Sequence, residues 1–254
     1  MRSKTVLLAS CVGAVGFAAG PAHAVDHFYG SLLGAYDIPS AKGFNAAFSN
    51  TVGNTTTSNF TASHFTDHYS KPENGFMVAV ALGYDLTDWV TPGLRVELEG
   101  AYRHNNVKGF LAAGFTTSHT TPARSSSASA SSTGADYTVW SLMANAWYEF
   151  DTGGRLRPFV GGGVGLARSK FTPEIVGGGI YTPTQDDAFA WQLGAGMNWH
   201  LNPHAAIGLG YRYFHAEDLT VVIPDFGLLT PPSRTYTIDG AHQDITLSLS
   251  YDLN

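Results

Sequence analysis

The sequence predicts an all-β chain, folded as an eight-stranded antiparallel up-and-down barrel that crosses a membrane. Three observations lead to this fold class. Runs of about 10–14 residues alternate between apolar and small or polar side chains, as half-buried strands do. The connections between these runs alternate between long and short. The face opposite the apolar one carries glycine, alanine, serine and a few grouped charges, unlike the outer face of a soluble sheet.

The composition limits the class of protein. The 254 residues are 44% hydrophobic but only 13% charged, against about 25% charged residues in a typical soluble domain. The formal net charge of −6 argues against a nucleic-acid partner, which would need a concentrated basic face. A single cysteine excludes a disulfide scaffold and a multi-cysteine metal site. No cofactor motif is present, so we expect no cofactor.

Residues 1–24 predict a secretory signal peptide, because two basic residues precede an uncharged stretch that ends in a small-x-small site. We expect cleavage after Ala24, which leaves residues 25–254 as one barrel domain without cysteine. Lipidation of Cys11 and an uncleaved membrane anchor are the alternatives. Both roles call for a longer apolar stretch than the sequence offers.

Alternation predicts the first four strands at 28–38, 75–86, 94–104 and 137–150. The first is ambiguous in phase, and its apolar face is taken as Phe28, Leu32, Tyr36 and Ile38. The second presents Phe76, Val78, Val80, Leu82, Tyr84 and Leu86. The third sets Leu94, Val96, Leu98, Gly100 and Tyr102 opposite four charged residues, Arg95, Glu97, Glu99 and Arg103. The fourth is taken to present Trp140, Leu142, Ala144, Ala146, Tyr148 and Phe150.

The last four strands are predicted at 156–168, 189–199, 205–215 and 244–253 by the same rule. Their apolar faces carry, in order, Leu156, Val160, Val164 and Leu166; Phe189, Trp191, Leu193, Ala195, Met197 and Trp199; Ile207, Leu209, Tyr211 and Tyr213; and Ile245, Leu247, Leu249, Tyr251 and Leu253. Central positions of these faces carry no charge in any of the eight runs.

The connection lengths orient the barrel. The long connections, rich in Ser, Thr, Gly, Pro and Asn, are 39–74, 105–135, 170–187 and 216–240. The short ones are 87–93, 151–155 and 201–204. Outer-membrane barrels have an even number of strands, short periplasmic turns and longer extracellular loops. We therefore expect four long outer loops, including the Ser/Thr-rich stretch 116–134, and three short periplasmic turns.

A soluble exported β-sandwich also alternates, and it is the main alternative fold. A sandwich normally exposes many Lys, Glu and Thr residues opposite its apolar face, whereas small residues dominate here. An eight-stranded barrel has an interior that side chains fill, which suits small residues and paired charges. The sequence therefore favours a wall that faces lipid in the outer membrane of a Gram-negative bacterium. The expected partners are outer-membrane lipid, lipopolysaccharide and the barrel-insertion machinery.

Aromatic residues are predicted to form two girdles at the membrane–water interfaces, where a ring with one wet and one apolar side is favoured. If the first strand runs outward, the periplasmic girdle contains Phe28, Tyr84, Tyr148, Phe150, Trp199 and Tyr251. The outer girdle then contains Tyr36, Phe76, Tyr102, Trp140, Trp191, Tyr211 and Tyr213.

Five segments carry a family resemblance: 28–32 (FYGSL), 94–100 (LRVELEG), 157–165 (RPFVGGGVG), 190–196 (AWQLGAG) and 210–214 (GYRYF). Together with the export signal they resemble opacity-type outer-membrane β-barrel proteins, over nearly the whole chain that follows the leader. The resemblance implies a porin-like or surface-antigen barrel and identifies no chemistry. Barrels of this kind usually finish on an aromatic residue that the insertion machinery reads, and this chain departs from the pattern with Leu253 and Asn254.

Charged residues on the non-apolar faces are predicted to meet inside the barrel. They are Arg95, Glu97, Glu99, Arg103, Glu149, Arg212 and Asp244, with Gln192 beside them. Because a buried charge without a partner is strongly disfavoured, we expect a salt-bridged network that plugs the lumen. A narrow gated path for ions is the alternative.

Other motifs point less clearly to chemistry. The glycine-rich segment 161–165 lacks the Lys-Ser/Thr and the helix of a phosphate loop, so glycines that face a crowded lumen explain it better. Two loosely spaced groups contain metal-ligand residue types, but solvated loop residues are the simpler interpretation. These groups are His64, Asp67 and His68, and His215 with Glu217 and Asp218. No motif fixes a nucleophile for a Ser-His-acid site.

The leading functional hypothesis is a non-enzymatic barrel whose long loops have a structural or cell-surface recognition role. Loops on a rigid scaffold commonly carry binding, and the loops here contrast with a regular wall. Passive passage of small solutes or ions is the second hypothesis. A lipid-modifying enzyme with catalytic residues on its outer rim is the third. The sequence indicates no particular ligand, receptor or solute.

Overall fold

The computed structural model describes residues 27–40, 44–51, 59–113, 116–118, 124–125, 134–174, 184–223 and 234–253. Of some of these only the backbone is described: 44–51, 59–71, 109–113, 116–118, 124–125, 134, 173–174, 221–223 and 234–237. The signal peptide predicted at 1–24 and the terminal Asn254 lie outside the described residues.

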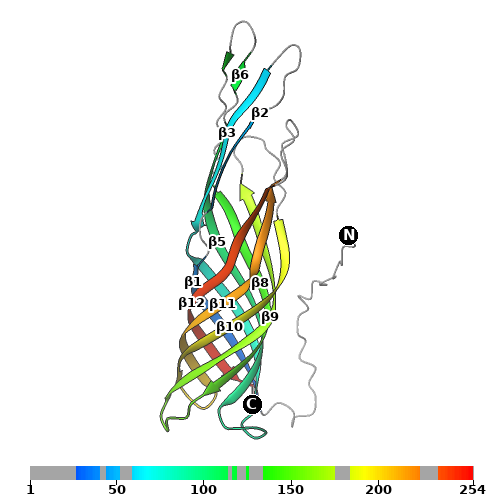
Figure 1. The fold of residues 1–254 in the computed structure, drawn as a ribbon. Helices are drawn as coiled ribbons and strands as arrows, with labels where there is room; N and C mark the ends of the chain where they lie inside the picture. Colours follow the sequence, from blue (N-terminus) through cyan, green and yellow to red (C-terminus); the bar gives the residue numbers. More distant parts are fainter. Residues whose placement is uncertain are drawn as a thin grey trace, which may run out of the picture.

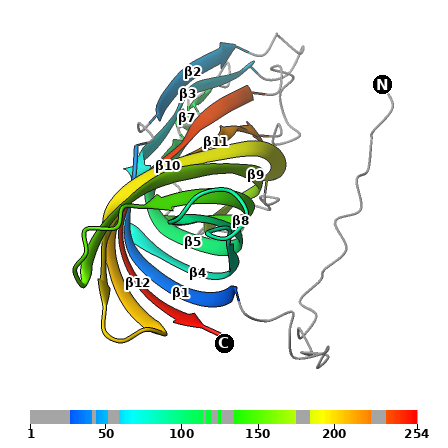
Figure 2. The ribbon, with the colours of Figure 1, turned by 90° about the horizontal axis from the view of Figure 1, so that it is seen from below.

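Eight antiparallel strands close a barrel, seen from the side in Figure 1 and along its axis in Figure 2. They are β1 (Phe28–Pro39), β4 (Gly75–Asp85), β5 (Leu94–Ala113), β8 (Gly134–Glu149), β9 (Leu156–Glu174), β10 (Thr184–His200), β11 (Ala205–Ile223) and β12 (Arg234–Asp252). Each strand pairs with the next one in this series, and β12 pairs with β1. The predicted eight-stranded up-and-down barrel is confirmed. Among the described residues, no helix is long and apolar enough to cross a membrane.

The barrel has two unlike ends. The short-turn end carries the connections β4–β5, β8–β9 and β10–β11, and the long-connection end carries the other four. Four additional strands extend from the latter: β2 (Phe44–Thr51), β3 (Asn59–Pro72), β6 (Thr116–Ser118) and β7 (Arg124–Ser125). Strand β3 pairs with β2, β5 and β6, and Figure 1 shows β2, β3 and β6 projecting beyond the ring.

The apolar faces point outward along the middle of every barrel strand. Leu32 is 60% exposed and Leu247 is 59% exposed, whereas the inward-facing Met77 is 0% exposed. This settles the phase of the two less regular strands, since Leu32 of β1 and Trp140 of β8 both lie on the exposed face as predicted. An exposed apolar band around a whole barrel is the surface that a hydrocarbon environment requires.

Several strands are longer at the long-connection end than the sequence predicts. Strand β5 continues to Ala113 instead of 104, β9 to Glu174 instead of 168, and β11 to Ile223 instead of 215. The physical reason is that the apolar side chains change from the outward face to the inward face along the same strand. In β9, Leu166 faces outward, but nearer the long-connection end it is Phe171 that is buried in the lumen. An alternation whose apolar phase switches looks like a strand end in the sequence.

The inward-facing apolar residues of this end form a cluster, which we call the outer core. It contains Val107, Ala135, Tyr137, Val139, Met143, Ala167, Phe171, Ala190, Phe214, Ala216, Leu219 and Ile238. The lumen is therefore filled by apolar side chains at the long-connection end, as in an ordinary soluble core.

A tight turn anchors the short-turn end next to Glu149. Gly93 has φ +85°, a left-handed conformation that glycine adopts without strain. Its carbonyl accepts a hydrogen bond of 2.8 Å from the Glu149 N–H. A Cβ at Gly93 would lie 2.2 Å from the Glu149 carbonyl oxygen, so only glycine fits this close approach.

A charged residue on the outward face of the wall is expected to destabilise the barrel by an amount that depends on its depth in the bilayer. Leu247 lies outward in the apolar band of β12, and Leu247→Arg is expected to lower the free energy of unfolding by about 2–4 kcal/mol. The control Thr220→Arg places the same charge on an exposed position of β11 beyond this band, with an expected cost of about 0–1 kcal/mol. Urea unfolding in lipid vesicles, followed by tryptophan fluorescence, measures both. Equal costs at the two positions would contradict a lipid-facing wall.

Candidate functional site

The barrel lumen gathers the charged residues that the sequence singles out. All seven lie on inward positions of their strands: Arg95, Glu97, Glu99, Arg103, Glu149, Arg212 and Asp244. Glu99, Arg103 and Asp244 are fully buried. The network is therefore a property of the lumen and has to be described layer by layer along the barrel axis.

Glycines on β9 make room for the large side chains of the neighbouring strand. Gly161 pairs with Trp147 and Gly163 pairs with Asn145 across the β8–β9 ladder. A Cβ on Gly161 would lie 2.6 Å from Cε3 of Trp147. The glycine-rich segment lies within strand β9 and lets bulky and polar side chains cross the lumen. This agrees with the crowded-lumen interpretation.

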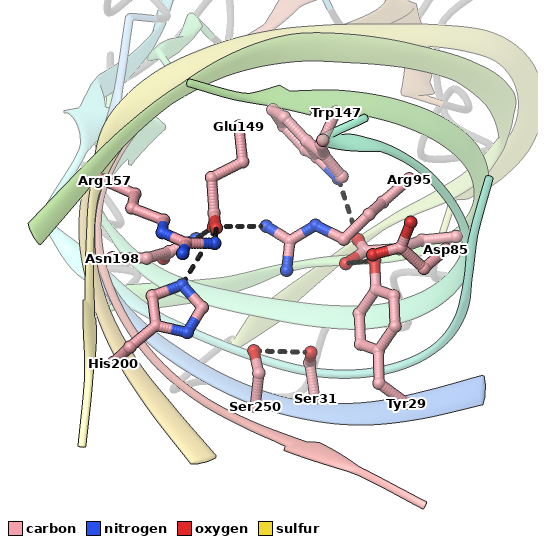
Figure 3. Close-up of polar contacts among 12 residues, drawn as sticks. Tyr29, Ser31, Asp85, Arg95, Trp147, Glu149, Arg157, Asn198, His200 and Ser250 are labelled. Atoms are coloured by element: carbon pink, nitrogen blue, oxygen red, sulfur yellow. Dashed lines mark hydrogen bonds and ion pairs between the residues drawn. The ribbon is translucent and has the colours of Figure 1, made fainter. Parts of the chain in front are cut away.

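The layer at the short-turn end is built around the Glu149 carboxylate (Figure 3). Arg95 Nη2 lies 2.9 Å from Oε2, and Asn198 Nδ2 donates to the same oxygen at 2.5 Å. His200 Nε2 lies 2.8 Å from Oε1, and Arg157 Nη1 lies 3.6 Å from it. Because Glu149 is only 6% exposed, these four partners compensate the desolvation of its charge.

Glu97 is held by neutral donors beside this layer. Tyr29 Oη donates to Oε1 at 2.8 Å and Trp147 Nε1 donates to Oε2 at 2.8 Å. The Arg95 guanidinium lies 5.3 Å from the centre of the Tyr29 ring, within cation–π range. Arg95 therefore links the Glu149 group to the Glu97 group across the lumen.

The middle layer is centred on Glu99. Arg212 Nη1 lies 2.6 Å from Oε2, and the side-chain amides of Asn145 and Gln192 approach the carboxylate to 3.4 Å. Gln192 also donates to Asn145 Oδ1 at 2.7 Å. The Arg212 guanidinium lies 4.8 Å from the centre of the Trp147 ring, so this layer packs directly on the layer below.

Two buried pairs form the next layer toward the long-connection end. Arg103 Nη2 lies 2.9 Å from Asp244 Oδ2, and its guanidinium covers the Phe214 ring at 3.9 Å. Asp37 and His242 are joined by contacts of 2.9 and 3.0 Å to His242 Nδ1, and both residues are fully buried. Phe214 belongs to the outer core, so the polar layers end where that apolar cluster begins.

Sequence reasoning missed several members of this network: Tyr29, Asp37, Asn198, His200 and His242. A signal for Asp37 existed, because it alternates with Tyr36 and Ile38 and must face inward once those residues face lipid. The contact between Asp37 and His242 depends on the β1–β12 register. This register sets Asp37 opposite Asp244, which lies two residues along β12 from His242. Register between the first and last strands is not encoded by a short turn and could not be read from the chain.

A polar cavity of about 560 Å³ opens at the short-turn end, and we call it the vestibule. Its lining includes Arg95 and Glu149 at the bottom and residues of all three short turns around the mouth. Asp85 and Asp252 lie on one side of it, and Arg157 and His200 on another. The lumen therefore contains solvent-sized space at one end, ion pairs in the middle and the outer core at the other end.

The predicted girdle residues lie on the outward face at the two ends of the apolar band. Ring contacts join Phe28 to Tyr84 (4.9 Å) and Tyr148 to Phe150 (4.8 Å) at the short-turn end. Tyr102 contacts Trp140 (4.6 Å) and Trp191 contacts Tyr213 (5.4 Å) toward the other end. The remaining outward girdle residues are Tyr36, Phe76, Trp199, Tyr211 and Tyr251.

The candidate metal ligands form two groups, and the structure describes the side chains of only one of them. The side chains of His64, Asp67 and His68 lie outside the described residues. His215, Glu217 and Asp218 are described on β11, and within the described part of the chain no three His, Cys, Asp or Glu side chains gather as a metal would require.

Comparisons with known proteins agree with this architecture. The sequence pattern of the family described as outer membrane protein beta-barrel domain matches residues 8–252. Uncharacterised proteins of Brucella abortus and Brucella suis are each 33% identical over 87 residues, which cover 31% of this chain. The chain spans 31% of the length of these curated relatives.

Solved structures that resemble the chain are outer-membrane proteins. Neisserial surface protein A is 16% identical with a TM-score of 0.47, over 89% of this chain and 97% of that one. OprG from Pseudomonas aeruginosa is 12% identical with a TM-score of 0.48, over 89% and 96%. The outer membrane protease OmpT from Escherichia coli is 8% identical with a TM-score of 0.42, over 90% and 97%.

The middle layer predicts a large loss of stability when its cation is removed. Arg212→Ala leaves the fully buried Glu99 without its ion-pair partner, and the free energy of unfolding is expected to fall by about 3–5 kcal/mol. Arg157→Ala removes a partly exposed cation and is expected to cost less than about 1 kcal/mol. Heat-modifiable gel mobility in detergent follows the unfolding temperature. If the Arg212 variant unfolds at the wild-type temperature, the ion pairs do not stabilise the barrel.

Proposed function

Because the chain belongs to the family of outer membrane protein beta-barrel domains, we propose that it is an integral, non-enzymatic protein of the bacterial outer membrane with a structural or cell-surface recognition role. Its long-connection end faces the cell exterior in this proposal, as long connections do in outer-membrane barrels. The partners are outer-membrane lipid and lipopolysaccharide, the insertion machinery during assembly, and an extracellular ligand.

The observation that carries this proposal is the length of the strands beyond the apolar band. A tilted strand needs about 9–11 residues to cross a bilayer, whereas β5 has 20 residues and β9, β11 and β12 have 19 each. The excess lies at the long-connection end, where the outer core packs inside the extended wall. A rigid projection of this kind supports recognition, since it presents its connections well above the membrane surface.

The state of the lumen also supports a surface role. Ion pairs occupy its middle layers, and the outer core fills it toward the exterior. An eight-stranded barrel has an interior only wide enough for side chains, and here charged and aromatic side chains cross it. The projecting end is then the part of the molecule most available to partners outside the cell.

Removal of the connections tests the recognition role. Replacing residues 41–71, 109–133, 175–183 and 224–233 with short turns is expected to preserve insertion, because the apolar wall and the lumen network remain. Adhesion of expressing cells to epithelial cells and to matrix-coated surfaces is expected to fall to the level of cells without the protein. Surface proteolysis and heat-modifiable mobility check insertion. A variant with a resequenced short turn at 151–155 is the control, and unchanged adhesion after loop removal would contradict the proposal.

A second candidate function is passive passage of small solutes or ions, and the vestibule favours it. This polar cavity of about 560 Å³ leads from the short-turn end to the Arg95–Glu149 pair. Passage from there would require the buried Arg212–Glu99 and Arg103–Asp244 pairs and the outer core to part.

Single-channel recording separates the two candidates. The wild-type protein in planar bilayers is expected to show no reproducible open steps, because buried side chains occupy the middle and outer lumen. A variant with Glu99→Gly and Arg212→Gly removes the middle layer and serves to reveal whether that layer is the barrier. Regular open steps from the wild-type barrel would promote the channel over the recognition role.

A further inference from the structure

Two basic residues of β9 lie on the outer surface just beyond the apolar band, at the long-connection end. Leu166 faces outward and is 54% exposed, whereas the next residue, Ala167, is buried in the lumen. Strand alternation then places Arg168 and Lys170 on the outward face, and both side chains reach solvent. Buried Ser169 between them confirms the phase.

The strand register places aromatic, hydroxyl and imidazole groups of β8 and β5 beside these cations, and one carboxylate of β10 against Arg168. Arg168 lies opposite Trp140 of β8, and Lys170 lies opposite Thr138, whose other neighbour is His104 of β5. Arg168 Nε and Nη2 bind Asp187 of β10 at 2.6 and 2.8 Å, an arrangement that orients the guanidinium and does not use Nη1. Lys170 forms no ion pair with any side chain in the part of the chain that the structure describes.

The distribution of outward cations is one-sided. Among the side chains described, outward-facing lysine and arginine residues on barrel strands are Lys108, Arg168 and Lys170, all on β5 and β9, which flank β8. Lys108 is paired with Glu73, and His104 lies 4.0 Å from Asp136. At the short-turn end the outward positions are aromatic or aliphatic: Phe28, Tyr84, Tyr148, Phe150, Leu156, Trp199 and Tyr251. The described outward cations therefore lie on one side of the barrel and at its long-connection end.

We propose that Arg168 and Lys170, with Trp140 and Thr138 beside them, bind the phosphate-bearing headgroup of an outer-leaflet lipid. The charged side chains lie where headgroups begin, because the aromatic and aliphatic side chains of Trp140 and Leu166 end the apolar band directly below. A lipid then places acyl chains on the band and phosphate against the cations, which a free anion does not do. The proposal rests on the membrane placement of the barrel and is independent of a recognition role for the connections.

Titration with a lipid of defined phosphorylation tests the site. Folded protein in detergent is titrated with diphosphorylated lipid A, and the bound fraction is measured by native mass spectrometry. Arg168→Gln and Lys170→Gln are each expected to weaken binding about tenfold, the effect of losing one charge-assisted hydrogen bond. The matched control Arg155→Gln removes one exposed cation from a short turn and is expected to leave binding within about twofold. Heat-modifiable mobility verifies that each variant is folded.

A variant of the opposite sign makes the test sharper. Asp187→Asn releases the Arg168 guanidinium from its carboxylate partner and removes a repelling charge, so lipid A is expected to bind more tightly. Dephosphorylated lipid A is expected to bind weakly to every variant. Undiminished binding by the Arg168→Gln, Lys170→Gln double variant would overturn the proposal. Full displacement of lipid A by millimolar inorganic phosphate would also overturn it, since the site would then recognise a free anion.

Discussion

The constraint on which the structure depends is the absence of hydrogen-bond partners and of charge solvation in the bilayer core. Backbone groups must pair with each other, so the sheet has to close, and β12 pairs with β1 along eleven residues to do so. Every side chain of a crossing strand then has only two environments. Leu247 and its outward neighbours meet hydrocarbon, and ionised residues such as Glu99 must turn to the lumen, where another charge must meet them.

Pairing inside a narrow barrel is a packing problem as well as an electrostatic one. Arg212 reaches Glu99 from the opposite wall, and Gly194 beside it leaves room for its side chain, since a Cβ there would lie 3.0 Å from Cγ of Arg212. Trp147 likewise crosses the lumen over Gly161 and then carries both a hydrogen bond to Glu97 and the stacked Arg212. The small residues of the lumen therefore determine which charges meet, and the ion pairs in turn hold strands that are far apart in the sequence.

The sequence predicts the features that follow from the alternation of side chains and from their position along the chain. The parity of Leu94 to Tyr102 against Arg95 to Arg103 predicts which side chains face inward, and the connection lengths predict the number and order of strands. Which side chains pair across the lumen depends on the strand register, and no residue type indicates that register. Asp37 and His242 are 205 positions apart and meet only through the β1–β12 seam. The extended ends of β5, β9 and β11 were also missed, because their apolar phase switches beyond the aromatic rows.

That phase switch divides the molecule into two environments along the same strands. In β8, polar Asn145 and Glu149 face the lumen while Leu142 faces outward, whereas farther along Tyr137 and Val139 fill the interior and Asp136 faces outward. The first arrangement suits hydrocarbon outside, and the second suits water outside. The switch in apolar phase near Trp140 and Arg168 therefore marks the level at which the bilayer ends. A headgroup site at Arg168 and a projection above it are two consequences of that one inversion.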